Sequence, residues 1–158
     1  MSDEPAFDFL ALTNKTFLVM GVANKKSVAY RIALLIEQAG GKGLACKVDI
    51  RDEEMVADAV EKTVAKFGGI DVLINNAGIS LVGAAEDTKI TEARAQMETN
   101  FWGVIHMNNA ILPTMRKQHC GKIIHISSLA GLFAIPYQSY YTASKHALEG
   151  YCESLRME

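Results

Sequence analysis

Cysteine and proline are scarce in this sequence, and neither sign of charge dominates. Three cysteines (Cys46, Cys120 and Cys152) lie far apart among 158 residues, without a CxxC pair. Such a set excludes a disulfide framework or a zinc site, and it predicts buried, reduced thiols in a cytosol-like compartment. Sixteen Lys and Arg against eighteen Asp and Glu leave a net charge of −2. This balance gives no reason to expect nucleic acid or an acidic membrane surface as a partner.

Long hydrophobic runs are missing too. The longest, such as residues 32–36, are far shorter than the roughly 20 residues that cross a bilayer. The acidic start at residues 1–5 lacks the basic and apolar parts of a signal peptide. No two of the four histidines stand at the close spacing of metal ligands. We therefore expect one cytoplasmic domain over residues 1–158, with no membrane segment and no metal.

What the sequence does contain is a regular alternation of strand-like and helix-like segments. Apolar, β-rich runs predict strands at residues 16–20, 44–49, 72–74 and 122–126. Three- and four-residue apolar spacing predicts helices that begin at Ser27 and that cover residues 53–67, 91–116 and 140–158. This alternation favours an α/β fold, a doubly wound parallel sheet of about four strands with helices on both faces.

Small or polar residues follow each predicted strand: Gly21, Asp49, Asn75–Gly78 and Ser127–Ser128. Parallel sheets of this kind bind ligands beyond the carboxyl ends of their strands. We therefore look for a site in these loops, although loops are also polar for reasons unrelated to binding.

The loop after the first strand joins it to the start of a helix. Gly21 permits close backbone approach, Ser27 can cap the helix, and Lys25 and Lys26 add positive charge. These features suit a dinucleotide pyrophosphate at a helix N-terminus. The loop has one glycine and lacks the dense glycine fingerprint, so an ordinary capped turn is the alternative. The segment Asn75–Gly78 is open to the same two interpretations.

Ser128, Tyr141 and Lys145 form the sharpest constellation. Tyr141 and Lys145 are four residues apart and share one face of the last predicted helix. Acid–base work at pH 7 needs the phenol pKa lowered from about 10 by roughly 2–3 units, about 3–4 kcal/mol. An ammonium about 4 Å away contributes about that much at an effective dielectric near 20. By itself the pair is weak evidence for a catalytic site, because Tyr-x-x-x-Lys often occurs by chance. The alternative interpretation of Lys145 is an ordinary solvated lysine on a helix.

The order of the motifs makes the pattern specific. Asn76-Ala77-Gly78, Asn100, Ile126–Gly131 and Tyr141–Lys145 follow one another, each in its expected structural place. From Gly43 to Glu158 the chain closely resembles the short-chain dehydrogenase/reductase family. The resemblance implies a Rossmann-type fold, NAD or NADP as cofactor, and reversible carbonyl–alcohol chemistry on a small molecule.

The resemblance also implies roles for single residues. Tyr141 is implied as the catalytic acid/base, Lys145 as the group that lowers its pKa and holds the nicotinamide ribose, and Ser128 as the hydroxyl that orients the substrate oxygen. Asn100 matches the asparagine that kinks its helix and supports a water relay. The implied cofactor-binding residues are Gly21, Ser27, Val28, Asp49, Ile50, Asn76, Ala77, Gly78, Tyr141 and Lys145, with Asp49 at the adenine.

The chain departs from the family pattern in three places. The loop from Gly21 to Ala29 is similar to that of enoyl-acyl-carrier-protein reductases, but Gln138 stands where that branch has its tyrosine. One βα unit is missing after residue 41, and we hypothesise that residues 44–49 pair with the first strand, placing Asp49 as the ribose selector. The closing substrate part has no counterpart, which would leave residues 122–126 as an exposed edge strand.

Three interpretations follow. The first is an NAD(P)-dependent oxidoreductase that acts on a carbonyl or alcohol substrate, for which the apolar stretch 129–140 suits an apolar compound. The second is a non-catalytic nucleotide-binding or dimerising product of the family. The third, an enoyl reductase, is disfavoured by Gln138. In the family, helices like those at 91–116 and 140–158 pack between subunits, so the resemblance implies a homo-oligomer.

Overall fold

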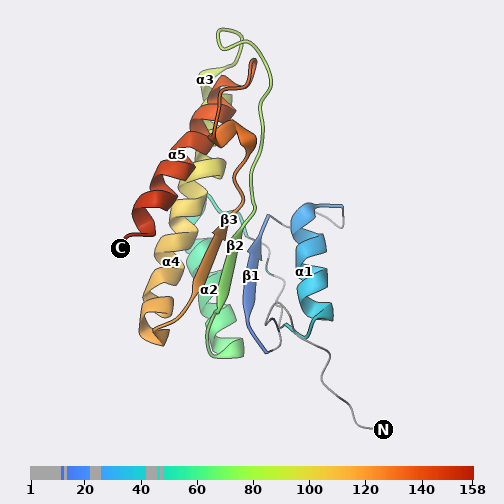
Figure 1. The fold of residues 1–158 in the computed structure, drawn as a ribbon, viewed down its shortest axis with the longest axis vertical. Helices are drawn as coiled ribbons and strands as arrows, with labels where there is room; N and C mark the ends of the chain where they lie inside the picture. Colours follow the sequence, from blue (N-terminus) through green and yellow to red (C-terminus); the bar gives the residue numbers. More distant parts are fainter. Residues whose placement is uncertain (1–11, 13, 22–25, 42–45, 47) are drawn as a thin grey trace.

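The predicted alternation of strands and helices leads to a parallel sheet flanked by helices, as a computed structural model shows (Figure 1). The structure describes residues 12, 14–21, 26–41, 46 and 48–158. Their elements are β1 (Phe17–Met20), α1 (Val28–Gln38), α2 (Glu53–Phe67), β2 (Val72–Asn75), α3 (Ile90–Met97), η1 (Glu98–Trp102), α4 (Gly103–Gln118), β3 (Lys122–His125), η2 (Leu129–Gly131) and α5 (Ser139–Leu155).

The central strand of the sheet is β2. It pairs in parallel with β1, from Phe17↔Val72 to Met20↔Asn75, and with β3, from Val72↔Lys122 to Asn75↔His125. The three strands therefore end in register, and the loops that follow them start at the same edge of the sheet. This is the edge at which the sequence predicts a ligand site.

Helices cover both faces of the sheet. Side chains alternate along each strand, so Leu18 and Leu73 join Val56 of α2 and Met107 of α4 in the larger core. On the opposite face Phe17, Val72 and Ile74 form a smaller core with Ile36 of α1. Figure 1 shows α1 beside β1, apart from the group of α2, α4 and α5. The doubly wound α/β arrangement is confirmed.

Local signals fix where the first two helices begin and end. The Ser27 hydroxyl accepts a hydrogen bond from the Tyr30 amide at 3.3 Å, so the predicted cap of α1 is confirmed. The bounds predicted for α2 are those observed; Asp52 caps it, and Gly68 ends it with a φ of +83°.

The predicted helix at 91–116 is longer and less regular than expected. α3, η1 and α4 form one helical stretch in which η1 is a π-helical segment that contains Asn100. A π-turn inserts one residue into the helix and re-aims the side chains around it. The kink that the family resemblance implies for Asn100 therefore coincides with an observed irregularity.

The predicted strand at residues 44–49 is the main correction to the fold. Among the described residues the sheet has three strands, and Cys46, Val48 and Asp49 belong to none; residues 44, 45 and 47 lie outside the description. Val48 packs against the larger core, and Asp49 begins a turn whose carbonyl accepts a hydrogen bond from the Asp52 amide. Val48 and Asp49 thus belong to a connection that packs against the core, and in the described chain β1 pairs with β2 alone, so the hypothesised pairing of this segment with the first strand is not observed.

At the other end of the sheet, β3 is an edge strand in the part of the chain that the structure describes. It pairs with β2 alone, and Ile124 remains 45% exposed. The exposed edge predicted for residues 122–126 is therefore confirmed.

The prediction of buried cysteines is wrong. Cys46 and Cys120 are exposed because they lie in connections, and Cys152 is half-buried on α5. All three thiols are unpaired in the structure. Within the described ranges, no group of three or more His, Cys, Asp or Glu side chains is arranged to hold a metal. None of the helices described is both long and apolar enough to traverse a bilayer.

Candidate active site at the strand ends

The loops after β1 and β2 touch at the edge of the sheet. Gly21 has a φ of +92°, and a Cβ atom built on it would lie 2.6 Å from the Ala77 amide nitrogen. Glycine is therefore required there, both for the left-handed backbone and for the close approach. Residues 22–25, which complete the first predicted loop, lie outside the described chain.

Asn100 locks the continuation of the second loop. Its Oδ1 accepts a hydrogen bond from the Ile79 amide at 2.8 Å, and its Nδ2 donates to the Ile79 carbonyl at 2.8 Å. Gln96, one turn earlier on the same helix, donates to that carbonyl at 3.1 Å. Both side chains are fully buried, so they hold the backbone that follows Asn76-Ala77-Gly78 in one place.

The same asparagine reaches the helix that carries Tyr141. Its Nδ2 also donates to the Ser144 hydroxyl at 3.1 Å, and that hydroxyl donates to the Tyr141 carbonyl at 2.7 Å. Ser144 is completely buried. A continuous set of hydrogen bonds therefore joins the loop after β2 to the first turn of α5, which brings three of the predicted motifs together.

Lys145 lies at the centre of this arrangement. Its Nζ is 5.9 Å from the centroid of the Tyr141 ring and donates to the Ile126 carbonyl at 2.8 Å. A Cβ built on Gly78 would be 3.9 Å from the same Nζ. Burial lowers the pKa of the Lys145 ammonium, and the negative charge of Glu149 opposes that effect. The predicted pairing of Tyr141 with Lys145 on one face of α5 is observed.

Ser128 and Ser127 follow β3, as predicted. The Ser128 hydroxyl accepts a hydrogen bond from the Ala130 amide at 3.2 Å and caps η2. The Ser127 hydroxyl is buried and has no hydrogen-bond partner among the described residues. It lies beside Gly131, where a Cβ would approach it to 2.8 Å. The hydrogen bond to the Ala130 amide thus fixes the Ser128 hydroxyl, whereas no such bond from the described chain holds the Ser127 hydroxyl.

Asp49 is engaged with its own neighbour. The single Nε–H of Arg51 is shared between the two oxygens of the Asp49 carboxylate, at 2.9 and 3.2 Å, and a terminal guanidinium nitrogen donates a further bond. Together with the Arg51 amide, these bonds lower the pKa of Asp49 from 3.8 to about 2. Asp49 is therefore a carboxylate at any physiological pH, half-exposed and tied to Arg51.

Three other predicted cofactor residues are placed by packing. Ile50 is buried in the larger core against Gly103, and its carbonyl lies 3.2 Å from Nδ1 of His106. Ser27 and Val28 form the start of α1, with the Val28 side chain exposed.

Two hydrogen-bonding residues of this site, Gln96 and Ser144, could have been found from sequence spacing. Gln96 is four residues before Asn100, and Ser144 is three after Tyr141, so each shares a helix face with a predicted residue. Their partners in other elements, however, are the Ile79 carbonyl for Gln96 and the Asn100 amide for Ser144, and no local sequence pattern predicts those contacts.

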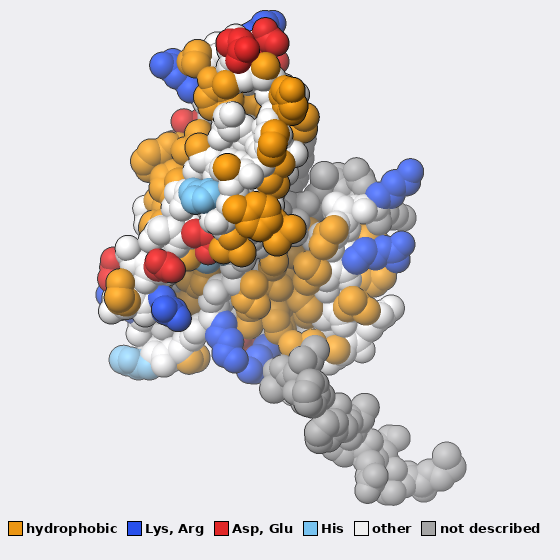
Figure 2. Space-filling view, turned by 45° about the horizontal axis from the view of Figure 1, so that its top comes forward, with side chains coloured by type: hydrophobic (Ala, Val, Ile, Leu, Met, Phe, Trp, Pro, Cys, Tyr) orange, Lys and Arg blue, Asp and Glu red, His pale blue; other side chains and the backbone are white. Residues whose placement is uncertain are grey.

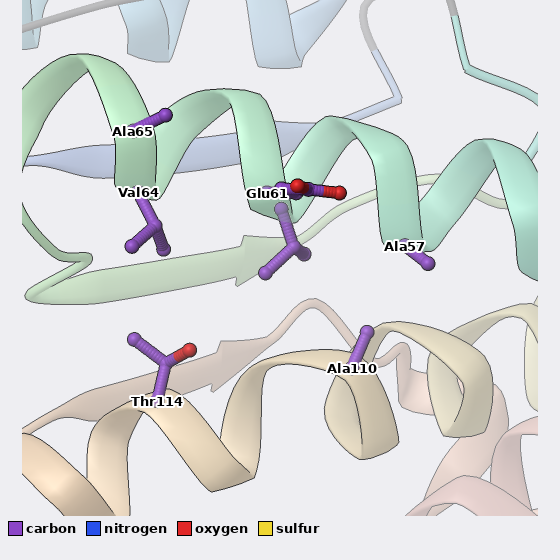
Figure 3. A pocket seen from close by; sticks show the side chains of 7 residues that line it. Ala57, Glu61, Val64, Ala65, Ala110 and Thr114 are labelled. Atoms are coloured by element: carbon purple, nitrogen blue, oxygen red, sulfur yellow. The ribbon is translucent and has the colours of Figure 1, made fainter.

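A separate groove of about 440 Å³ lies between α2 and α4 (Figure 3). It is lined by small and apolar side chains, with Glu61 at its side: Ala57, Val60, Glu61, Val64, Ala65, Ala110 and Thr114. None of these residues belongs to the predicted site, so the groove is distinct from the strand-end chemistry.

The residues at the strand ends fit a dinucleotide. Gly21 and Gly78 offer bare backbone, the capped N-terminus of α1 follows the first loop, and the ammonium of Lys145 stands beside Gly78. Helix N-termini and uncovered backbone amides suit phosphates, and an ammonium suits the hydroxyls of a ribose.

Known proteins share both the sequence pattern and the geometry. The short chain dehydrogenase family profile matches residues 10–158. A 3-ketodihydrosphingosine reductase from Bacteroides thetaiotaomicron is 49% identical over 118 residues, covering 75% of this chain and 44% of that protein. The chain thus spans less than half the length of this relative.

Solved structures agree with this relationship. A short-chain dehydrogenase from Streptomyces avermitilis superposes with a TM-score of 0.83 at 30% identity, covering 89% of this chain and 59% of its own. ElxO with NADP bound gives 0.82 at 31% identity, covering 87% and 64%. The match over residues 10–158, the relative at 49% identity and the shared fold establish that the chain belongs to the short-chain dehydrogenase/reductase family.

Proposed function

We propose that this chain carries the catalytic machinery of an oxidoreductase, which transfers hydride between NAD or NADP and a carbonyl or alcohol substrate. One observation carries the proposal: the Lys145 ammonium lies 5.9 Å from the Tyr141 ring centroid and beside Gly78, at the carboxyl ends of the strands. Ligands of doubly wound sheets bind at this edge.

Each side chain of the site has a separate role in this reaction. Tyr141 gives a proton to the carbonyl oxygen in reduction and takes it back in oxidation. Lys145 stabilises the tyrosinate electrostatically; it has three N–H groups, of which one serves the Ile126 carbonyl, so two remain for ribose hydroxyls. Ser128 orients the substrate oxygen, and Asn100 keeps the loop after β2 and the first turn of α5 in register. The nicotinamide, when bound, supplies or accepts the hydride.

An apolar ketone is the substrate that the surroundings favour. Ile79 and Val82 follow β2, and Leu129, Leu132 and Tyr137 follow β3, all of them exposed. Two hydrogen bonds draw these loops together, from the Gly83 amide to the Tyr137 carbonyl and from the Tyr140 hydroxyl to the Ala85 carbonyl. Figure 2 shows hydrophobic side chains gathered over this face. The relative named 3-ketodihydrosphingosine reductase supports a keto substrate.

In this proposal Asp49 sets the cofactor preference by virtue of its charge, because it is a half-exposed carboxylate, although it lies in a connection and not on a strand. An acid near the adenosine ribose favours NADH over NADPH. Asp49→Ala should therefore lower the preference for NADH in paired titrations with the two cofactors. The same preference in the variant and the wild type would remove Asp49 from this role.

We also propose a cytoplasmic homo-oligomer that associates through α3–α4 and α5. Phe101 stacks edge-on against Trp102 and Tyr151, with ring centroids 5.1 and 6.2 Å apart, and Trp102 is 47% exposed. Half-exposed aromatic clusters are typical of interface centres. Sedimentation of the wild type and Trp102→Glu tests this surface.

The decisive experiment follows NAD(P)H oxidation with ketones of increasing chain length. Wild type should turn over the longer ketones, and Tyr141→Phe should lose activity by orders of magnitude while it still binds cofactor. Equal rates in both proteins would reject the catalytic proposal. Binding without turnover in the wild type would favour a nucleotide-binding product instead. Reduction of an enoyl thioester would favour the enoyl reductase interpretation, which rests on the loop from Gly21 to Ala29.

A further inference from the structure

A buried chain of polar side chains lies beneath Lys145 and has no part in the mechanism above. The Asn75 amide nitrogen donates to Asn108 Oδ1 at 3.0 Å and lies 3.2 Å from His125 Nδ1. The Asn108 amide nitrogen in turn donates to the Tyr151 hydroxyl at 3.3 Å. Asn75 and Asn108 are almost fully buried. The chain therefore crosses the molecule from β3 through β2 and α4 to α5.

The direction of these bonds matches one tautomer of the imidazole. With the Asn75 NH₂ group as donor, the contact at 3.2 Å is satisfied by a neutral ring that accepts at Nδ1 and carries its proton on Nε2. A second proton would turn Nδ1 into a donor that faces another donor. Relief requires the Asn75 amide to turn over, which presents its oxygen to His125 and to Asn108.

That reversal cannot stop at Asn75. Each amide has one oxygen and one nitrogen, so Asn108 must turn as well, and Tyr151 must then donate where it now accepts. The chain has two fully bonded states of opposite direction, and no mixed state satisfies every group. Buried polar networks switch between such states as a unit because a half-satisfied network is costly.

The end of the chain at His125 is joined to the catalytic lysine. The Ile126 amide, one residue on, donates to the Asn75 carbonyl at 2.9 Å, and the Ile126 carbonyl accepts the bond from Lys145 Nζ at 2.8 Å. Asn75 thus contacts the His125 ring through its side chain and the Ile126 amide through its backbone carbonyl. Ile126 therefore links His125 and Asn75 to Lys145, because its amide bonds to Asn75 and its carbonyl bonds to Lys145.

The charged groups around His125 all come from α5. Lys145 acts against protonation of the imidazole, Glu149 favours it, and burial is the largest effect, lowering the pKa of His125. Tyr151 of α5 is the other titratable group in the chain, whereas β2 and α4 present the neutral amides of Asn75 and Asn108. The neutral ring is therefore the resting form at neutral pH.

We propose that His125, together with Asn75, is a positioning residue for Lys145, and that protonation of His125 reverses the buried chain and loosens Lys145 from Ile126. The claim that His125 and Asn75 position Lys145 is argued from hydrogen-bond geometry alone. The consequence for cofactor affinity rests on the proposed function, in which Lys145 holds the nicotinamide ribose.

Imidazole and lysine NMR of the labelled wild type tests the placement. At pH 7.5 His125 should have its proton on Nε2, and between pH 7.5 and 5 the Cε resonance of Lys145 should shift with the midpoint of His125. His125→Asn should abolish that shift. The control His119→Asn should keep it, because His119 is an exposed helix cap with φ of +55°, a conformation that asparagine tolerates. A proton on Nδ1, or a Lys145 resonance indifferent to His125, would overturn the proposal.

The functional consequence is measured by calorimetric titration with NAD⁺ and with NADP⁺ over the same pH range, using whichever of the two binds more tightly. Wild type and His119→Asn should lose affinity several-fold as pH falls, about tenfold if binding lowers the His125 pKa by one unit. His125→Asn should show a flat profile, and a profile as steep as that of wild type would contradict the functional step. A wild type that binds neither NAD⁺ nor NADP⁺ at any pH rejects the proposed function, while the NMR titration of the wild type, which needs no cofactor, still decides the placement.

Discussion

Single residues at the strand ends are placed by contacts with segments far away in the sequence. Lys145 is the clearest case, because its ammonium is buried, bonds to Ile126 and approaches Gly78. Burying an ammonium opposes folding, and its lowered pKa is the sign of that cost. The burial of Lys145 is therefore explained by its proposed role at the active site and not by a gain in folding stability.

Replacement of this lysine should separate its effect on folding stability from its effect on activity. Lys145→Met keeps the length of the side chain and removes the buried charge. We therefore expect its free energy of unfolding to be at most about 1 kcal/mol below that of wild type, or to exceed it. Activity and cofactor affinity should both fall, because Lys145 serves ribose and tyrosine. Urea unfolding and cofactor titration measure the two effects, with exposed Lys66→Met as the matched control. A large loss of stability in Lys145→Met alone would show a structural role instead.

His125 gives the molecule a pH dependence with a definite sign. Its folded-state pKa is lowered by burial, so the folded protein prefers the neutral ring. This preference is fully present above the unfolded pKa, near 6.5, and is lost as pH falls below it through the folded pKa. The unfolding free energy of wild type should thus decline between pH 6.5 and 5, relative to His125→Asn, by at most about 1.4 kcal/mol per pH unit. Parallel curves would show that His125 titrates alike in both states.

Among the elements, those defined by local signals could be predicted and those defined by distant contacts could not. Ser27 caps α1, and Gly68 ends α2, so both helices follow from neighbouring residues. A kink at Asn100 was implied by the resemblance alone, and the π-helical turn that produces it was not predicted, because apolar periodicity tolerates one inserted residue. Val48 and Asp49 misled the strand prediction, since their spacing suits a strand but their partners are the core and Arg51.

The same reasoning applies to the candidate site. Spacing on one helix predicted Tyr141 with Lys145, since that relation is local. The hydrogen bonds of Gln96, Ser144 and His125 join different elements. They depend on the parallel register of β2 with β3 and on the way α5 packs, which the sequence does not display.

The contact between the loops after β1 and β2 can be tested with two glycines that share a backbone conformation. Gly21 and Gly68 have φ of +92° and +83°, but a Cβ at Gly21 would meet the backbone of Ala77, whereas one at Gly68 would meet nothing within 4 Å. Gly68→Ala should cost about 1–2 kcal/mol, the conformational penalty alone. Gly21→Ala should cost clearly more in denaturant unfolding and should also weaken cofactor binding. Equal costs would mean that the loops can separate freely.

At the scale of the whole molecule, the sheet is covered unequally. The strand β2 is buried throughout, whereas β3 alternates between exposed and half-buried residues and pairs on one side only in the described chain. Ile124 and Ile126, at 45% and 40% exposure, face the surface along this edge. An unpaired edge that displays β-branched side chains is a template for further strand pairing. The chain spans less than half of its 3-ketodihydrosphingosine reductase relative.

The exposed edge of β3 should determine whether the protein self-associates at high concentration. Ile124→Lys places a charge on the edge strand, where lysine is a natural guard against strand addition. We expect it to suppress open-ended association in light scattering, with a melting temperature within a few degrees of wild type, because Ile124 is half-exposed and belongs to neither core. Trp102→Glu is the comparison: it should dissolve a closed oligomer formed through α4 and α5 without changing association through β3. If Trp102→Glu alone abolished all association, the edge of β3 would be inert and the aromatic helix surface would be the sole interface.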